Sequence, residues 1–153
     1  STSPARLASS PSPGKRKHLN IEESLQLVLD SSDNFGRAFY DEFFIRHPKM
    51  FGYFEGVDMT RQSLMLTMAL TTIVHHYANP SVAIDHYLQH LGTMHHRREI
   101  PPELYPKWSD TMLRVLGKYL GEDWDEELAG EWRKALEKAS HTLVRGYDRP
   151  VGI

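Results

Sequence analysis

Nine histidines are the residues of this chain that most clearly invite a chemical interpretation, because neutral imidazole is the most common metal ligand in proteins. His86 and His90 are four residues apart and would share one face of a helix, as two zinc ligands can, but no obvious third ligand accompanies them. His75 and His76 stand close to an expected helix end, where a solvated imidazole interacts favourably with the helix dipole. Three others belong to no pattern: His18, His47 and His141.

His95 is distinguished by the sequence around it. It closes the segment LGTMH at positions 91–95, and Tyr105 follows ten residues later. The chain has no cysteine, which excludes disulfides, thiolate metal sites and cysteine nucleophiles. His95 is therefore the histidine for which the sequence indicates a specific role.

The composition of the whole chain predicts one compact domain. With 153 residues, 40% of them hydrophobic, the chain is long enough for one sizeable core and too short to suggest two. The net charge of -2 gives no electrostatic footprint for nucleic acid or an anionic membrane, so small molecules are the expected partners. The longest apolar stretch, residues 64–74, is broken by threonines and is too short to span a bilayer, so we expect no transmembrane helix.

The first residues differ in composition from the rest. They are rich in serine, proline, alanine and glycine and are followed by three basic residues, without the apolar run of a secretory signal. We expect a disordered tail over residues 1–18, a folded domain over residues 19–148 and a flexible end over residues 149–153. A cytoplasmic setting fits this organisation.

Apolar residues recur along the chain at helical intervals, and no strand pattern competes with them. Asn20 and Glu23 have the spacing of a capping box, and an aromatic helix face from Phe35 ends at Pro48. Residues 48–56 are typical of a short corner. The pattern predicts helices that begin near Asn20, Phe35, Asp58 or Thr60, Ser81, Pro102 and Trp124. The fold class is therefore all-α.

Several residues also recur in the order and spacing of a known family. They are Tyr40 within Phe39-Tyr40-Asp41, Phe44, Pro48, Phe54, Gln62, Leu66, Leu91, Gly92, His95, Ile100, Pro102, Tyr105 and Trp132. In these positions the stretch from Phe35 to Val144 resembles the globin family, in particular single-domain bacterial globins and the globin domain of flavohaemoglobins. The resemblance implies a globin fold, a three-over-three helical sandwich around a haem pocket.

The resemblance also implies a role for residues on the proximal side of the haem. His95 matches the proximal ligand of the iron, and haem b is the cofactor expected there. The residues that would contact the haem are Phe54, which matches the phenylalanine that wedges against its plane, together with Leu66, Leu91, Ile100 and Tyr105. Arg98 is a candidate partner of a haem propionate, as are Arg61 and Arg97, because guanidinium matches carboxylate geometry.

On the distal side the resemblance implies a tyrosine and a glutamine. Tyr40 falls on the distal tyrosine of flavohaemoglobins, and Gln62 takes the distal place that a histidine fills in other globins. Dioxygen gains negative charge when it binds ferrous iron, so a phenolic hydroxyl and an amide could both donate hydrogen bonds to it. Leu66, one turn after Gln62, would cover the ligand and exclude water.

The chain departs from flavohaemoglobins in two respects. In that group the proximal imidazole is polarised through a tyrosine and a glutamate. Tyr105 matches the tyrosine, but the glutamate's position is occupied by Tyr147, with Asp148 beside it. These 153 residues include no flavin reductase domain, so we expect repeated turnover to need electrons from a separate reductase.

Several functions follow from the resemblance, and the sequence leaves them open. The leading hypothesis is reversible binding of dioxygen, with nitric oxide and carbon monoxide as further ligands. The alternatives are nitric oxide dioxygenation with a separate reductase, the gas-sensing domain of a longer signalling protein, and a globin fold without haem. No residue is assigned as catalytic.

Overall fold

The computed structural model describes residues 18–148, apart from the side chains at positions 32 and 33. Regular structure in this range is entirely helical, which confirms the predicted all-α class. The helices are α2 (Ile21–Leu29), α3 (Ser32–Arg46), α4 (Met59–Ala78), α5 (Val82–Arg97), α6 (Leu104–Leu120) and α7 (Glu126–Arg145), with 3-10 helices η1 (Pro48–Phe54), η2 (Gly121–Asp123) and η3 (Gly146–Asp148). The predicted tail and flexible end lie outside the described residues, except for His18.

Polar side chains cap helices α2, α4 and α5 at positions that the sequence predicts. Asn20 and Glu23 form the capping box of α2, in which each side chain accepts a hydrogen bond from the other's backbone amide. Asp58 caps α4 and Ser81 caps α5 in the simpler way, through one side-chain oxygen each. The start of α6 differs from the sequence pattern, because Pro102 precedes the helix and its carbonyl accepts a hydrogen bond from the amide of Tyr105.

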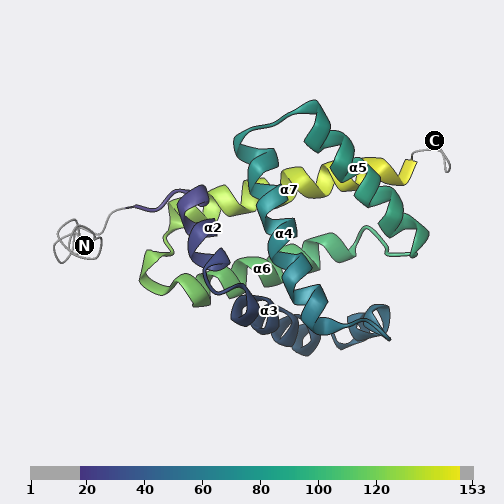
Figure 1. Cartoon of the computed structure of the whole chain (residues 1–153), viewed down its shortest axis with the longest axis horizontal. Coiled ribbons are helices and arrows are strands. Elements are labelled where there is room, and N and C mark those ends of the chain that lie inside the picture. The colour runs from purple at the N-terminus through teal and green to yellow at the C-terminus, as the bar shows by residue number, and fades with distance from the viewer. Residues whose placement is uncertain (1–17, 149–153) are drawn as a thin grey trace.

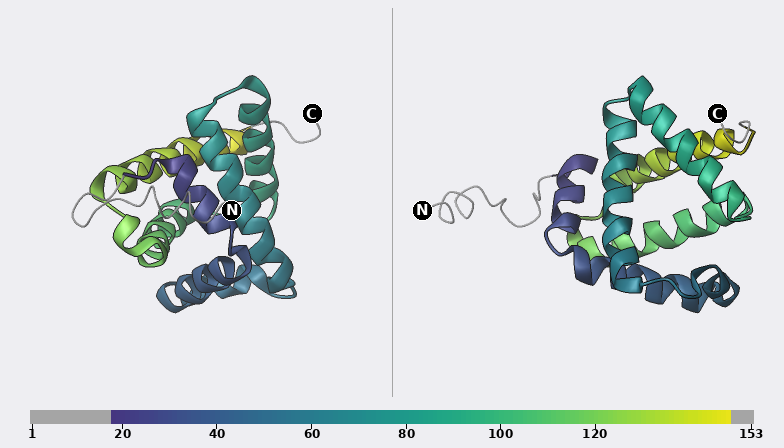
Figure 2. Two further views of the ribbon diagram at one scale, coloured as in Figure 1. Left: turned by 60° about the vertical axis from the view of Figure 1, so that its left-hand side comes forward. Right: turned by 45° about the vertical axis from the view of Figure 1, so that its right-hand side comes forward.

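Helix α4 is the central element of the fold. It packs against α3 near its start and against α7 further along, while α3 also packs on α6 and α5 packs on α7. Figure 1 shows α4 crossing α6 and α7, and Figure 2 shows α3 beside the beginning of α4 and α5 descending from beyond its end. These five helices therefore surround one interior region from different directions.

Two glycines allow the closest of these helix crossings. A Cβ atom at Gly36 of α3 would lie 2.7 Å from the Cβ of Ser63 in α4, and one at Gly92 of α5 would overlap the backbone carbonyl of Leu143 in α7. Both crossings lie within one helical turn of the residues that the sequence singles out, Tyr40 and His95. The glycines thus set the helix distances that position the site.

Candidate functional site

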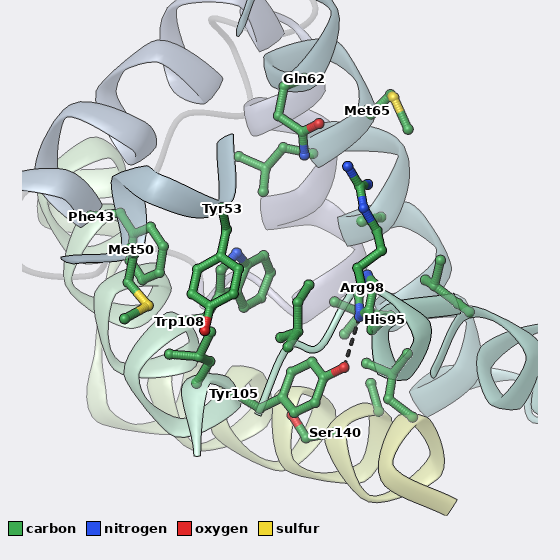
Figure 3. A pocket seen from close by; sticks show the side chains of 18 of the residues that line it. Phe43, Met50, Tyr53, Gln62, Met65, His95, Arg98, Tyr105, Trp108 and Ser140 are labelled. Atoms are coloured by element: carbon green, nitrogen blue, oxygen red, sulfur yellow. Dashed lines mark hydrogen bonds between the residues drawn. The ribbon is translucent and has the colours of Figure 1, made fainter. Parts of the chain in front are cut away.

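One cavity of about 610 Å³ lies between α3, α4, α5, α6 and α7, with η1 at its edge. Its lining is mainly apolar, and Figure 3 shows side chains converging on it from several of these helices. Nine of the residues that the sequence indicates for the site line this one cavity: Tyr40, Phe54, Gln62, Leu66, Leu91, His95, Arg98, Ile100 and Tyr105. A volume of this size is typical of cofactor and small-molecule sites.

His95 on α5 is held by a series of hydrogen bonds. Its Nδ1 lies 2.7 Å from the hydroxyl of Tyr105 on α6, the bond drawn in Figure 3. The Tyr105 hydroxyl lies 3.0 Å from that of Tyr147 in η3, which in turn donates to the carbonyl of Ile100 at 2.7 Å. Because Nδ1 is engaged, Nε2 is the nitrogen that His95 can offer to a metal.

The imidazole of His95 is kept neutral by its surroundings. Burial lowers its pKa below the ordinary histidine value, and the positive charge of Arg98 lowers the pKa further. Arg98 itself is exposed while also lining the cavity, so its guanidinium stands where buried and solvent regions meet. A neutral imidazole with a free lone pair is the form that binds metals.

Tyr40 and Gln62 form a pair on the α3–α4 side of the cavity. The amide nitrogen of Gln62 donates a hydrogen bond of 2.9 Å to the hydroxyl oxygen of Tyr40. Burial raises the pKa of Tyr40 to about 12, although the bond from Gln62 opposes this shift, so the phenol keeps its proton at neutral pH. Since the oxygen of Tyr40 already accepts from Gln62, its proton is available for another acceptor.

Aromatic rings build the wall behind this pair. The ring of Phe54 meets those of Tyr40 and Phe44 edge to face, with centroid separations of 5.4 Å and 5.3 Å. Phe39, which is fully buried, lies 5.3 Å from the indole of Trp108 on α6. Phe39 and Phe44 also contact the ring of Tyr40 directly, at centroid separations of 5.1 Å and 5.8 Å, so aromatic neighbours hold this phenol from several sides.

The structure also separates residues that the sequence analysis considered together. Arg61 and Arg97 are exposed and do not line the cavity, whereas Arg98 does. His86 and His90 are exposed on α5, and no group of three or more His, Asp or Glu side chains among the described residues could hold a metal ion. The zinc alternative for these two histidines therefore has no third ligand in the described part of the chain.

Other lining residues were not identified from the sequence. They include Met50, Tyr53, Trp108 and Ser140. Trp108 could have been found, because it lies three residues after Tyr105 and hence on the same face of α6. Ser140 carries no such signal, because a small polar residue on α7 is equally typical of a solvated helix face.

Comparisons with known proteins agree with this fold. The globin family model matches residues 37–143, and the chain therefore belongs to the globin family. Among solved structures, it is similar to a protein of Pseudomonas aeruginosa PAO1 described as structurally highly homologous to a human hemoglobin. The two share 26% sequence identity with a TM-score of 0.72, and the match covers 85% of this chain and 100% of the other.

Two further searches were negative. No curated protein gave a significant match to the chain. Among the described residues, no helix combines the length and the apolar character needed to cross a membrane.

Membership of the globin family implies that the chain binds haem and, through it, diatomic gases.

Proposed function

We propose that this protein is a haem b globin that binds dioxygen reversibly, with His95 as the proximal iron ligand and Tyr40 and Gln62 on the distal side. One observation carries the proposal. A single cavity has a neutral imidazole with free Nε2 among its α5 residues and a hydrogen-bonded phenol and amide among its α3 and α4 residues. A gas-binding haem needs both features, one to hold the iron and one to stabilise the ligand.

The composition of the cavity fits a haem. Its lining is mainly apolar, as the macrocycle requires, and Phe54, Leu66, Leu91 and Ile100 would supply part of the contact. Arg98 stands at the solvent side of the same cavity, where its guanidinium would pair with a propionate. When bound, the haem supplies an iron coordination position that a diatomic gas can occupy.

The distal residues would then stabilise the gas. Tyr40 keeps a phenolic proton that no neighbour accepts among the described residues, and this proton can be donated to a ligand that carries negative charge. Gln62 orients the phenol by donating to its oxygen. Leu66 is buried one helical turn from Gln62 and would limit the access of water to the ligand. Together these groups favour tight binding and slow release of dioxygen.

The proposal is tested by the haem content and spectra of three proteins. Replacing His95 with Gly should strongly weaken haem retention and change the Soret band, while added imidazole should restore a histidine-like spectrum. His90→Gly is the matched control, since His90 lies on the same helix, is exposed and does not line the cavity. Unchanged Soret absorption and haem affinity in the His95 variant would refute the assignment.

Nitric oxide dioxygenation is a second candidate function, favoured by the same Tyr40–Gln62 pair. Donors that stabilise negative charge on dioxygen would also stabilise charge that develops when nitric oxide reacts with it. Stopped-flow mixing of the oxygenated protein with nitric oxide measures the first turnover, and repeated turnover with a reductase and its electron donor measures catalysis. A fast first turnover that no reductase can sustain would restrict the protein to gas binding or scavenging.

A further inference from the structure

A series of hydrogen bonds connects His95 through Tyr105 and Tyr147 to the backbone carbonyl of Ile100. That carbonyl determines which group donates and which accepts in each bond. The Ile100 carbonyl can only accept, so the single hydroxyl proton of Tyr147 is donated to it, at 2.7 Å. The oxygen of Tyr147 must then accept the proton of Tyr105, across 3.0 Å. Tyr105 has no proton left for His95, and its oxygen accepts from Nδ1–H at 2.7 Å. The series therefore selects the tautomer of His95 in which Nε2 is unprotonated.

The end of this series is neutral. A carboxylate in the place of Tyr147 would attract the protons of the series and give the imidazole partial negative charge, which makes Nε2 a stronger donor to iron. A backbone carbonyl carries no net charge and exerts a much weaker pull. Tyr147 donates its hydroxyl proton to Ile100 and Tyr105 donates its own to Tyr147, so in this series each phenol keeps its proton and neither is an anion that could replace the carboxylate.

The fold holds Tyr147 in this place from the α5 side. The hydroxyl of Thr93 donates a 2.7 Å hydrogen bond to the carbonyl of Gly146, and a Cβ at Gly146 would overlap the carbonyl of Gln89. The ring of His96 lies 4.9 Å from the ring of Tyr147. The end of α7 is thereby docked on the last turns of the helix that carries His95. Tyr147 does not line the cavity that contains His95, so we expect it to act on a group bound there through Tyr105 and His95.

We propose that Tyr147 is a positioning residue that fixes His95 as a neutral Nδ1–H imidazole and so sets the site for reversible gas binding rather than for oxygen activation. The inference rests on the proposed function, because it assumes that Nε2 of His95 binds the haem iron. A bound iron would receive less electron density from this series, which ends on a backbone carbonyl, than from a series that ends on a carboxylate. Tyr147 is thus a determinant of which chemistry the pocket favours.

Two substitutions with opposite expected effects test this role in the haem-loaded full chain. Tyr147→Glu places a carboxylate near Tyr105 and should raise the iron–histidine stretching frequency of the ferrous protein in resonance Raman spectra. Tyr147→Phe removes the acceptor of the Tyr105 proton, so it should lower that frequency and weaken haem affinity by about tenfold. Tyr119→Phe is the matched control, because Tyr119 lies on α6 and its hydroxyl is 3.5 Å from the carbonyl of Leu27, away from the series.

Nuclear magnetic resonance of the same proteins with ¹⁵N-labelled histidine gives a second readout. The Nδ1 proton of His95 should be protected from exchange in the wild type and in Tyr119→Phe, and less protected in Tyr147→Phe. A purely structural role of Tyr147 would not shift the stretching frequency in opposite directions in its two variants.

The outcomes distinguish the inference from the function on which it rests. A wild-type protein without an iron–histidine band would overturn the proposed function and the inference with it. A wild-type band that neither Tyr147 variant moves would overturn the inference alone and leave His95 as the iron ligand.

Discussion

Removing the hydroxyl of Tyr40 should accelerate the release of dioxygen from the ferrous protein by about ten- to a hundredfold. The phenol is buried and protonated, and its proton is the one free to reach a ligand, because its oxygen already accepts from Gln62. A hydrogen bond to a charged acceptor contributes roughly 1.5–3 kcal/mol, and about 1.4 kcal/mol corresponds to a factor of ten in an equilibrium constant. Tyr40→Phe keeps the ring and its packing, so the effect isolates the hydroxyl.

The corresponding change at Gln62 should have a smaller effect. In the observed geometry the amide acts mainly through Tyr40, by polarising the phenol at a distance of 2.9 Å. Polarisation along a hydrogen-bonded chain strengthens each bond by roughly 10–30%, so Gln62→Leu should accelerate release by less than about fivefold. The order of the two effects follows from the direction of a single hydrogen bond.

Stopped-flow measurement of dioxygen dissociation provides the assay for both variants. Carbon monoxide is the internal control, because it gains little charge on binding and should dissociate at nearly the same rate from the wild type and from Tyr40→Phe. A larger acceleration in Gln62→Leu than in Tyr40→Phe would refute the reasoning, since the amide would then be the principal donor. Equal acceleration for both gases in Tyr40→Phe would instead indicate a change in pocket shape.

Three further predictions concern stability. Gly92→Ala should lower the free energy of unfolding by about 2 kcal/mol or more, because its methyl group overlaps the backbone of Leu143; an unchanged midpoint in urea would contradict this. Trp132→Phe should cost about 1–3 kcal/mol in the same assay, because the indole loses its 2.9 Å bond to the buried hydroxyl of Ser24. Burial lowers the pKa of His76 below 6.5, so the unfolded chain binds the extra proton more readily and stability should fall as the pH drops below 6.5. His76→Leu should reduce this loss between pH 7.5 and 5.5, and an unaltered pH dependence would contradict it.

The elements of the fold could be predicted because their signals are local. Asn20, Asp58 and Ser81 cap helices within three residues of their own positions, and the apolar period identifies the buried faces. The convergence of distant residues on one cavity could not be obtained this way. We predicted it from the resemblance to globins, which implies that His95 and Gln62 lie on opposite sides of one haem pocket. Helical periodicity alone does not indicate which distant residues meet.

Two details of the site lay beyond the sequence for physical reasons. The series behind His95 ends on the backbone carbonyl of Ile100, and every residue has such a carbonyl, so no residue type marks this one. From the sequence, Tyr40 and Gln62 are both expected to donate hydrogen bonds to the gas. In the structure one amide proton of Gln62 is directed at Tyr40, a contact between α3 and α4 that no local sequence pattern specifies.

The hydrogen bonds around Tyr40 and those around Tyr147 are both expected to affect the negative charge on bound dioxygen, from opposite sides of the haem. In the proposed function Tyr40 would stabilise negative charge on dioxygen, whereas the neutral end of the Tyr147 series would limit how much charge a bound iron transfers to it. Among the described residues, no hydrogen bond or ring contact joins Tyr40 and its partners to Tyr147 and its partners. We therefore expect the most direct coupling between substitutions at the two tyrosines to pass through a bound haem and its ligand. If Tyr147→Glu raises the negative charge on dioxygen, Tyr40→Phe should accelerate dioxygen release more in that background than in the wild type. The hydrogen bond that Tyr40→Phe removes would then have had a more negative acceptor.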